Sequence, residues 1–222
     1  MGMLSRRAFL AGLLPAPIAA QEFISVDHAL TDTDFYRLVA CAAPPGGDCA
    51  KPIVRWPAER RLALRVGIAD ASPVFPSYKF DLADQAIDAA IAEINGVGAN
   101  LFLERRFAGP FDVPIYLTDA GQGELIEGTG NSQIDGSEIS IGRVVLRSRG
   151  SDILEAAIAI SRDIGRREIA SVMLEEMVQA MGLPTDIAGA AYARSIFSET
   201  GNSVVWLRGQ DAEALRLHYP RV

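Results

Sequence analysis

The chain has 222 residues, of which 49% are hydrophobic and 22% are charged, a composition typical of a globular protein. Its formal net charge of −7 argues against nucleic-acid binding, which usually needs a basic face. Only two histidines and two cysteines are present, so a zinc site made of three histidines or four cysteines is excluded. We therefore expect carboxylates, amides and hydroxyls to carry any chemistry.

Residues 1–20 are typical of a cleavable export signal. They contain Arg6 and Arg7, no acidic residue, and a short apolar stretch at 8–14. The run Ser-Arg-Arg-Ala-Phe-Leu at 5–10 resembles the twin-arginine (Tat) export motif, and an ordinary Sec signal is the alternative. Cleavage near Ala20 would leave a soluble periplasmic or secreted protein, and no later segment is apolar enough to predict a transmembrane helix.

Residues 21–58 predict an N-terminal extension with a helix at 32–42 and a disulfide loop. Cys41 and Cys49 flank a Pro-Pro-Gly-Gly run that allows the chain to fold back. In an oxidising compartment, two cysteines at this spacing favour a bridge over two free thiols. The bridge is expected to be structural because the C-x-x-C spacing of redox proteins is absent.

The remaining residues, 59–222, predict one α+β domain. Hydrophobic periodicity predicts strands at 61–69, 101–107, 113–118, 139–148 and 156–161, and helices at 81–95, 166–181 and 211–218. Residues 119–138 predict a long acidic loop, and 189–205 also predict irregular structure. This order favours a mixed five-stranded sheet with two main helices and a C-terminal helix.

The loop at 119–138 is one candidate for cation binding. Its oxygen-bearing side chains are Asp119, Glu124, Glu127, Asn131, Asp135 and Glu138. Such ligands suit calcium, but the spacing of an EF-hand is absent and an acidic surface loop is the default interpretation. His218 is expected to decorate the end of the last helix, where a histidine is favourable without being a ligand.

The helix predicted at 166–181 carries Glu175, Glu176 and Gln179 on one narrow polar strip. Glu175 and Gln179 are four residues apart, so their side chains are neighbours, and Glu176 lies on the other flank of Gln179. Such a strip is most often the solvated face of an amphipathic helix. In a buried cleft, two adjacent carboxylates could instead share a proton and perform acid–base chemistry.

The segment Glu175–Asp186 resembles the metzincin zinc-protease signature H-E-x-x-H-x-x-G-x-x-H. Glu176 falls on the general-base glutamate and Gly182 on the glycine, while Asp186 comes one place after the last ligand. The positions of the three zinc histidines are held by Glu175, Gln179 and Thr185. The frame of the signature is therefore kept while all of its zinc ligands are replaced.

The resemblance extends to the order of the elements, since metzincins place a strand, a helix, three strands and a fifth strand before the active-site helix. The run Ser195–Phe197 looks like their Met-turn with phenylalanine in place of methionine, and 211–219 looks like their closing helix. More closely, the pattern E-E-x-x-Q-A-x-G-L resembles a proteobacterial family of exported proteins of unknown function. Both resemblances imply a zincin-like (metzincin-like) fold, and the family of unknown function gives no established activity.

These resemblances lead to competing predictions of function. The first is a periplasmic pseudo-protease whose cleft around Glu175, Glu176 and Gln179 binds a peptide or protein partner of the cell envelope. The second is an active hydrolase or peptidase with Glu176 as general base, in which Glu175, Gln179 and Asp186 hold the substrate or a metal ion. A structural envelope protein is the third. No metal or other cofactor is predicted, and the alternative is a divalent ion that accepts oxygen ligands.

Overall fold

The computed structural model of the chain describes residues 18–19, 22–201 and 203–221. The export signal predicted at 1–20 thus lies outside the described residues except for its positions 18 and 19. None of the helices in the described ranges is long and apolar enough to span a lipid bilayer.

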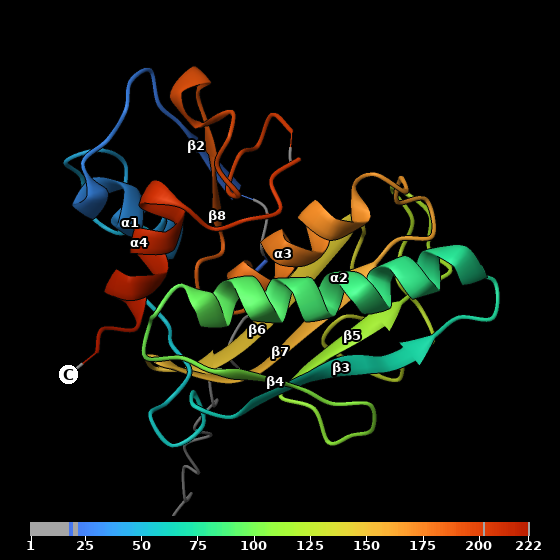
Figure 1. Cartoon of the computed structure of the whole chain (residues 1–222). Helices are drawn as coiled ribbons and strands as arrows, with labels where there is room; N and C mark the ends of the chain where they lie inside the picture. The colour runs from blue at the N-terminus through green and yellow to red at the C-terminus, as the bar shows by residue number, and fades with distance from the viewer. Residues whose placement is uncertain (1–17, 20–21, 202, 222) are drawn as a thin grey trace, which may run out of the picture.

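The described chain contains both strands and helices (Figure 1). In order, the elements are β1 (Ile18–Ala19), β2 (Glu22–Ser25), α1 (Asp32–Cys41), β3 (Leu64–Ala71), α2 (Ser77–Gly96), β4 (Leu103–Arg105), β5 (Val113–Leu117), β6 (Gly142–Arg149), β7 (Asp152–Ile160), α3 (Ile169–Gln179), β8 (Thr185–Ala188), a 3-10 turn (Ala190–Tyr192) and α4 (Gly209–His218). The helices and strands predicted from periodicity are all present, with ends shifted by a few residues.

The main sheet has the strand order β1-β6-β7-β5-β3-β4. Strands β4, β3, β5 and β7 run parallel, whereas β6 runs antiparallel to β7. The predicted α+β class and mixed five-stranded sheet are therefore confirmed, and the two-residue strand β1 adds to the open edge of β6. Helices α2 and α3 lie side by side on one face of this sheet (Figure 1).

The two faces of the sheet are covered differently. Val144 and Leu146 of β6 belong to the main core, which lies under α2 and α3. Val145, which points to the other face, packs in a second, smaller cluster with isoleucines of the loop at 119–138, namely Ile126, Ile134 and Ile139. The loop is irregular as predicted, but it also covers the sheet because its isoleucines are buried against it.

A second sheet joins the start of the described chain to the segment that follows α3. Strand β2 pairs in parallel with β8, so that Phe23 lies opposite Asp186. Neither strand was expected, because four-residue segments such as Thr-Asp-Ile-Ala carry too little periodicity to be recognised. Helix α1 packs against α4 in the same part of the molecule (Figure 1).

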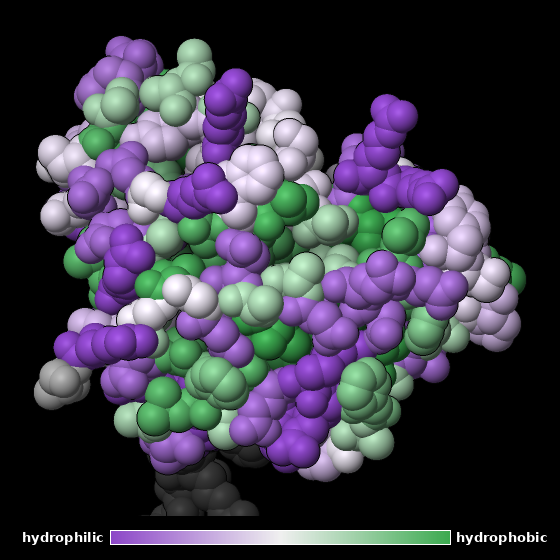
Figure 2. All heavy atoms as spheres, viewed as in Figure 1, coloured by the Kyte–Doolittle hydropathy of each residue, from purple (hydrophilic) through white to green (hydrophobic). Residues whose placement is uncertain are grey.

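The N-terminal segment is tied to the rest of the molecule. The predicted disulfide between Cys41 and Cys49 is present. Leu38 and Trp56 are buried in the same core as the sheet and helices. Ile24 of β2 is partly buried and packs against the same core. The surface in the view of Figure 1 is mostly polar, with smaller apolar areas between the polar side chains (Figure 2).

Candidate functional site

Helix α3 turns its polar strip toward the protein interior. Glu176 is 5% exposed and Gln179 is 2% exposed, whereas Glu175 is half-buried. Thr185 and Asp186, at the start of β8, are also buried. The residues singled out in the signature therefore lie in the interior, and the interpretation of the strip as an ordinary solvated helix face is wrong for Glu176 and Gln179.

A tight turn after α3 brings β8 back beside the helix. Gly182 has a φ of 99°, in a region that favours glycine. A Cβ atom at this position would lie 2.3 Å from the carbonyl oxygen of Val54 and 2.8 Å from Nε2 of His218. The returning chain places Asp186 where its Oδ1 accepts a hydrogen bond of 3.0 Å from Nε2 of Gln179.

An acidic pocket of about 400 Å³ lies between α3, β8 and the beginning of β6. Its lining residues are Phe23, Ser140, Ile141, Gly142, Val172, Glu175, Glu176, Asp186, Ser198, Glu199 and Gly201. Gly142 makes room for the buried carboxyl group, because a Cβ atom there would lie 2.3 Å from Oε1 of Glu176. The pocket thus gathers carboxyl groups from a helix, a strand and a loop.

The carboxyl group of Glu176 is held in an unfavourable environment for a negative charge. Burial, together with the nearby Glu175 and Asp186, raises its pKa well above the usual range, and Arg143 opposes this effect only in part. Its Oε2 atom is buried and has no hydrogen-bond partner among the described residues. Such an atom is costly to bury without a partner, so it is a natural contact point for a ligand.

Asp186 is affected by the same neighbours. Burial raises its pKa to about 8, and the negative charges of Glu175 and Glu199 add to this. The hydrogen bond from Gln179 and the charge of Lys51 act in the opposite direction. Asp186 is therefore largely protonated at neutral pH, and a cation that approaches either buried carboxyl group favours its charged form.

The residues do not fit the zinc ion that the metzincin resemblance implies. Gln179 points its amide nitrogen at Asp186, and Thr185 keeps a buried hydroxyl group without a partner in the described part of the chain. Zinc prefers imidazole or thiolate ligands, which are absent from these positions. Within the described ranges, no group of three or more histidine, cysteine, aspartate or glutamate side chains is arranged to hold a metal ion.

The turn resembling a Met-turn is anchored from the last helix. Ser195 donates a hydrogen bond of 2.6 Å from Oγ to Oδ1 of Asp211, and the backbone N–H of Ile196 donates to Oδ2 at 2.9 Å. Phe197 is buried in the core. Ser195 is thus engaged in holding the turn.

The prediction that His218 decorates a helix end is wrong. Its ring is completely buried, with Nε2 3.0 Å from the carbonyl oxygen of Val54 and Nδ1 3.3 Å from the hydroxyl oxygen of Tyr36. Burial lowers its pKa to about 3, so the ring is neutral and joins α4 to the N-terminal segment. Its partners come from distant parts of the sequence, which is why local position alone was misleading.

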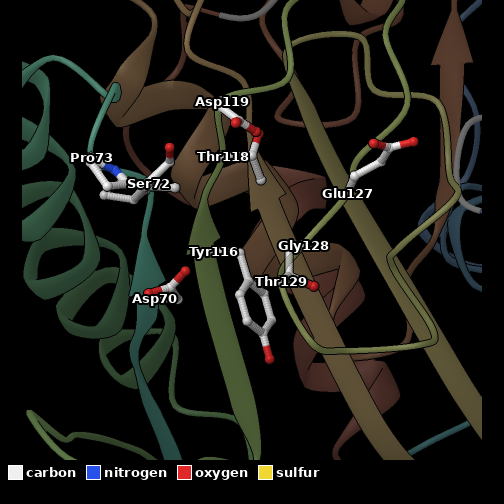
Figure 3. A pocket seen from close by; sticks show the side chains of 10 residues that line it. Asp70, Ser72, Pro73, Tyr116, Thr118, Asp119, Glu127, Gly128 and Thr129 are labelled. Atoms are coloured by element: carbon white, nitrogen blue, oxygen red, sulfur yellow. The ribbon is translucent and has the colours of Figure 1, made fainter.

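A smaller pocket of about 220 Å³ lies at the ends of β3 and β5, beside the acidic loop (Figure 3). Asp70, Asp119 and Glu127 line it. Other carboxylates of the loop are engaged within the loop: Asp135 accepts hydrogen bonds from Thr129, and Glu124 accepts one from the backbone of Gly121. These hydrogen bonds fix the conformation of the loop at Gly121 and Thr129.

Most of the residues that line the larger pocket were missed in the sequence, and three of them shape its chemistry. Phe23 follows the predicted signal, Gly142 begins β6, and Glu199 lies in a stretch predicted to be irregular. Only the glycine carries a recognisable signal, since a glycine at the start of an apolar strand often marks a close approach of another group. The other two reach the site through tertiary contacts alone.

A family model matches the C-terminal part of the chain. Residues 132–222 match the model of a family described as a protein of unknown function (DUF2927). No curated protein matches the chain. The matched range includes β6, α3 and β8, and therefore all of the carboxyl groups that line the acidic pocket. The match supports the predicted relation to an uncharacterised family.

Proposed function

We propose that this chain is a non-catalytic peptide-binding protein of the cell envelope, built on a zincin-like domain in which the zinc ligands have been replaced. The order β3, α2, β4, β5, β6, β7, α3 is the order that the metzincin resemblance implies. The proposal keeps the predicted export to the periplasm, with a peptide or protein as the partner.

The observation that carries the proposal is the pairing of β1 with β6. Ile18 lies opposite Leu146 and Ala19 opposite Val145, in antiparallel orientation. The edge of β6 thus accepts an extended chain, which is the way many proteins bind peptides. Residues 18–19 belong to the predicted signal, so cleavage near Ala20 would remove β1 and open this edge beside the acidic pocket.

The same pocket favours binding over hydrolysis. A general base must be ionised to accept a proton, whereas burial and its neighbours raise the pKa of Glu176 well above the usual range. The alternative, an active hydrolase, is supported by one observation: carboxyl groups with raised pKa values gathered in a pocket are common in active sites. In an enzyme, Glu176→Gln would abolish turnover.

We expect residues 21–222 to bind a peptide of residues 14–20, and the full chain to bind it more weakly because its own β1 covers the same edge. Fluorescence anisotropy of the labelled peptide measures both affinities. Each protein is also incubated with peptide libraries, and mass spectrometry detects any cleavage. Equal binding by the two proteins would argue against the edge as the site, and cleavage that Glu176→Gln abolishes would favour the hydrolase.

A further inference from the structure

We propose that the acidic pocket receives a lysine or arginine side chain of the bound peptide, at the residue that lies opposite Gly142. This inference rests on the proposed binding of a peptide to β6. It goes further by naming the chemistry of one residue of that peptide and its register on the strand.

The register follows from the pairing of β1. In an antiparallel pair, each step forward along one strand is a step back along the other. Ala19 lies opposite Val145. A peptide that pairs with β6 in the register of β1 and continues past the position of Ala19 therefore places the third residue after that position opposite Gly142. In the chain itself that residue would be Glu22, but the backbone leaves β6 and Glu22 pairs with Thr185 of β8 instead.

The side chain at this position points toward the carboxyl groups. Residues directly opposite each other in an antiparallel pair share a face of the sheet, with Cβ atoms about 5 Å apart. The Cβ direction of Gly142 leads to Oε1 of Glu176, only 2.3 Å from where a Cβ atom would lie. A long side chain on the peptide therefore extends over Gly142, which offers no side chain of its own, into the acidic pocket.

The pocket has the charge and the open hydrogen-bonding capacity for a cationic group. Glu175, Glu176, Asp186 and Glu199 all line it. The Oε2 atom of Glu176, on a side chain that is 95% buried, lacks a hydrogen-bond partner within the described residues. A guanidinium or ammonium group would donate to this atom and favour the charged form of the carboxyl groups.

The rim of the pocket offers an apolar surface to the methylene groups of a lysine or arginine side chain. Phe23 lines the pocket and is 51% exposed. Lysine and arginine pack their methylene groups on apolar surface, and arginine also stacks on aromatic rings. The nearby cations, Arg143 and Lys51, act on Glu176 and Asp186 respectively, but both carboxyl groups keep raised pKa values in their presence.

Three peptides test the inference. Each spans residues 14–23 and carries arginine, glutamine or the native glutamate at position 22, and each is titrated into residues 21–222 by fluorescence anisotropy. We expect the arginine peptide to bind about tenfold more tightly than the glutamine peptide, and the glutamate peptide to bind least tightly. Equal affinities for arginine and glutamine would overturn the inference and leave edge binding intact. Binding by none of the three would overturn the proposed function itself.

Variants of the protein assign the effect to the pocket. Glu176→Gln and Glu175→Gln are expected to remove most of the preference for the arginine peptide over the glutamine peptide. Glu175 is half-buried, so its replacement keeps the test valid if the Glu176 variant folds poorly. Glu104→Gln, on β4 at the opposite edge of the sheet, is the matched control and should keep the full preference. A preference that survives both pocket variants would contradict the inference.

Discussion

Replacement of Asp186 by asparagine is expected to stabilise the protein by roughly 5 kcal/mol at pH 8–9 and to change its stability little near pH 4. Burial raises the pKa of Asp186 to about 8 from an ordinary value of 3.8. At pH values between 3.8 and about 8, the Asp186 carboxyl group keeps its proton in the folded state and has lost it in the unfolded state. The contribution of this group to stability is therefore complete below about pH 4 and is lost as the pH rises to about 8.

Asparagine removes this dependence because it has nearly the same shape and does not ionise. Its Oδ1 atom can still accept the hydrogen bond that Gln179 donates to Asp186. Urea unfolding of both proteins at several pH values between 4 and 9 measures the difference in the free energy of unfolding. Asp70→Asn, an exposed position on β3, serves as the control. A difference between wild type and Asp186→Asn that is constant across this range would show that Asp186 is not the source of the dependence.

Replacement of Gly182 by alanine is expected to destabilise the protein by about 3 kcal/mol or more, because two separate costs add at this position. The φ of 99° strains any residue with a side chain. The new Cβ atom would also meet the carbonyl oxygen of Val54 at 2.3 Å, and a backbone atom of a packed segment cannot easily move away. Peptide binding should weaken too, since this turn places Asp186 beside Gln179.

Gly136→Ala separates the two costs. Gly136 has a φ of 82°, but a Cβ atom there would meet no atom within 4 Å. Only the backbone strain applies, so we expect a loss of about 1 kcal/mol in the free energy of unfolding. Thermal and urea unfolding of both variants measure the difference. Equal losses would mean that the contact with Val54 relaxes and contributes nothing.

The parts of the fold that depend on local pattern were predictable from the sequence. The apolar stripe of α2 and the alternation along β6 depend on neighbouring residues, and the bridge between Cys41 and Cys49 closes a short loop. Strands β2 and β8 were not predictable, because each is short and is stabilised by a partner more than 150 residues away. Sequence patterns do not contain that pairing.

The candidate site was predictable in its residues and not in its environment. Spacing placed Glu175, Glu176 and Gln179 on one strip of the helix, but a solvated strip has the same spacing as a buried one. The start of β6 and the return of the chain at β8 decide that Glu176 is buried. The raised pKa values follow from that burial, so they were beyond the reach of the sequence as well.

Before export, while the predicted signal is still attached, β1 covers part of the edge of β6. An open strand edge is a template for association with other chains, and proteins protect such edges with short strands or with a covering segment. Strand β4, at the opposite edge, has only three residues, and β1 covers β6. If residues 1–20 stay attached until the protein has crossed the membrane, the part of the β6 edge at Val145 and Leu146 stays covered during export. The open edge would then first appear in the compartment where its partner is found, so that removal of the signal would set the moment at which binding begins.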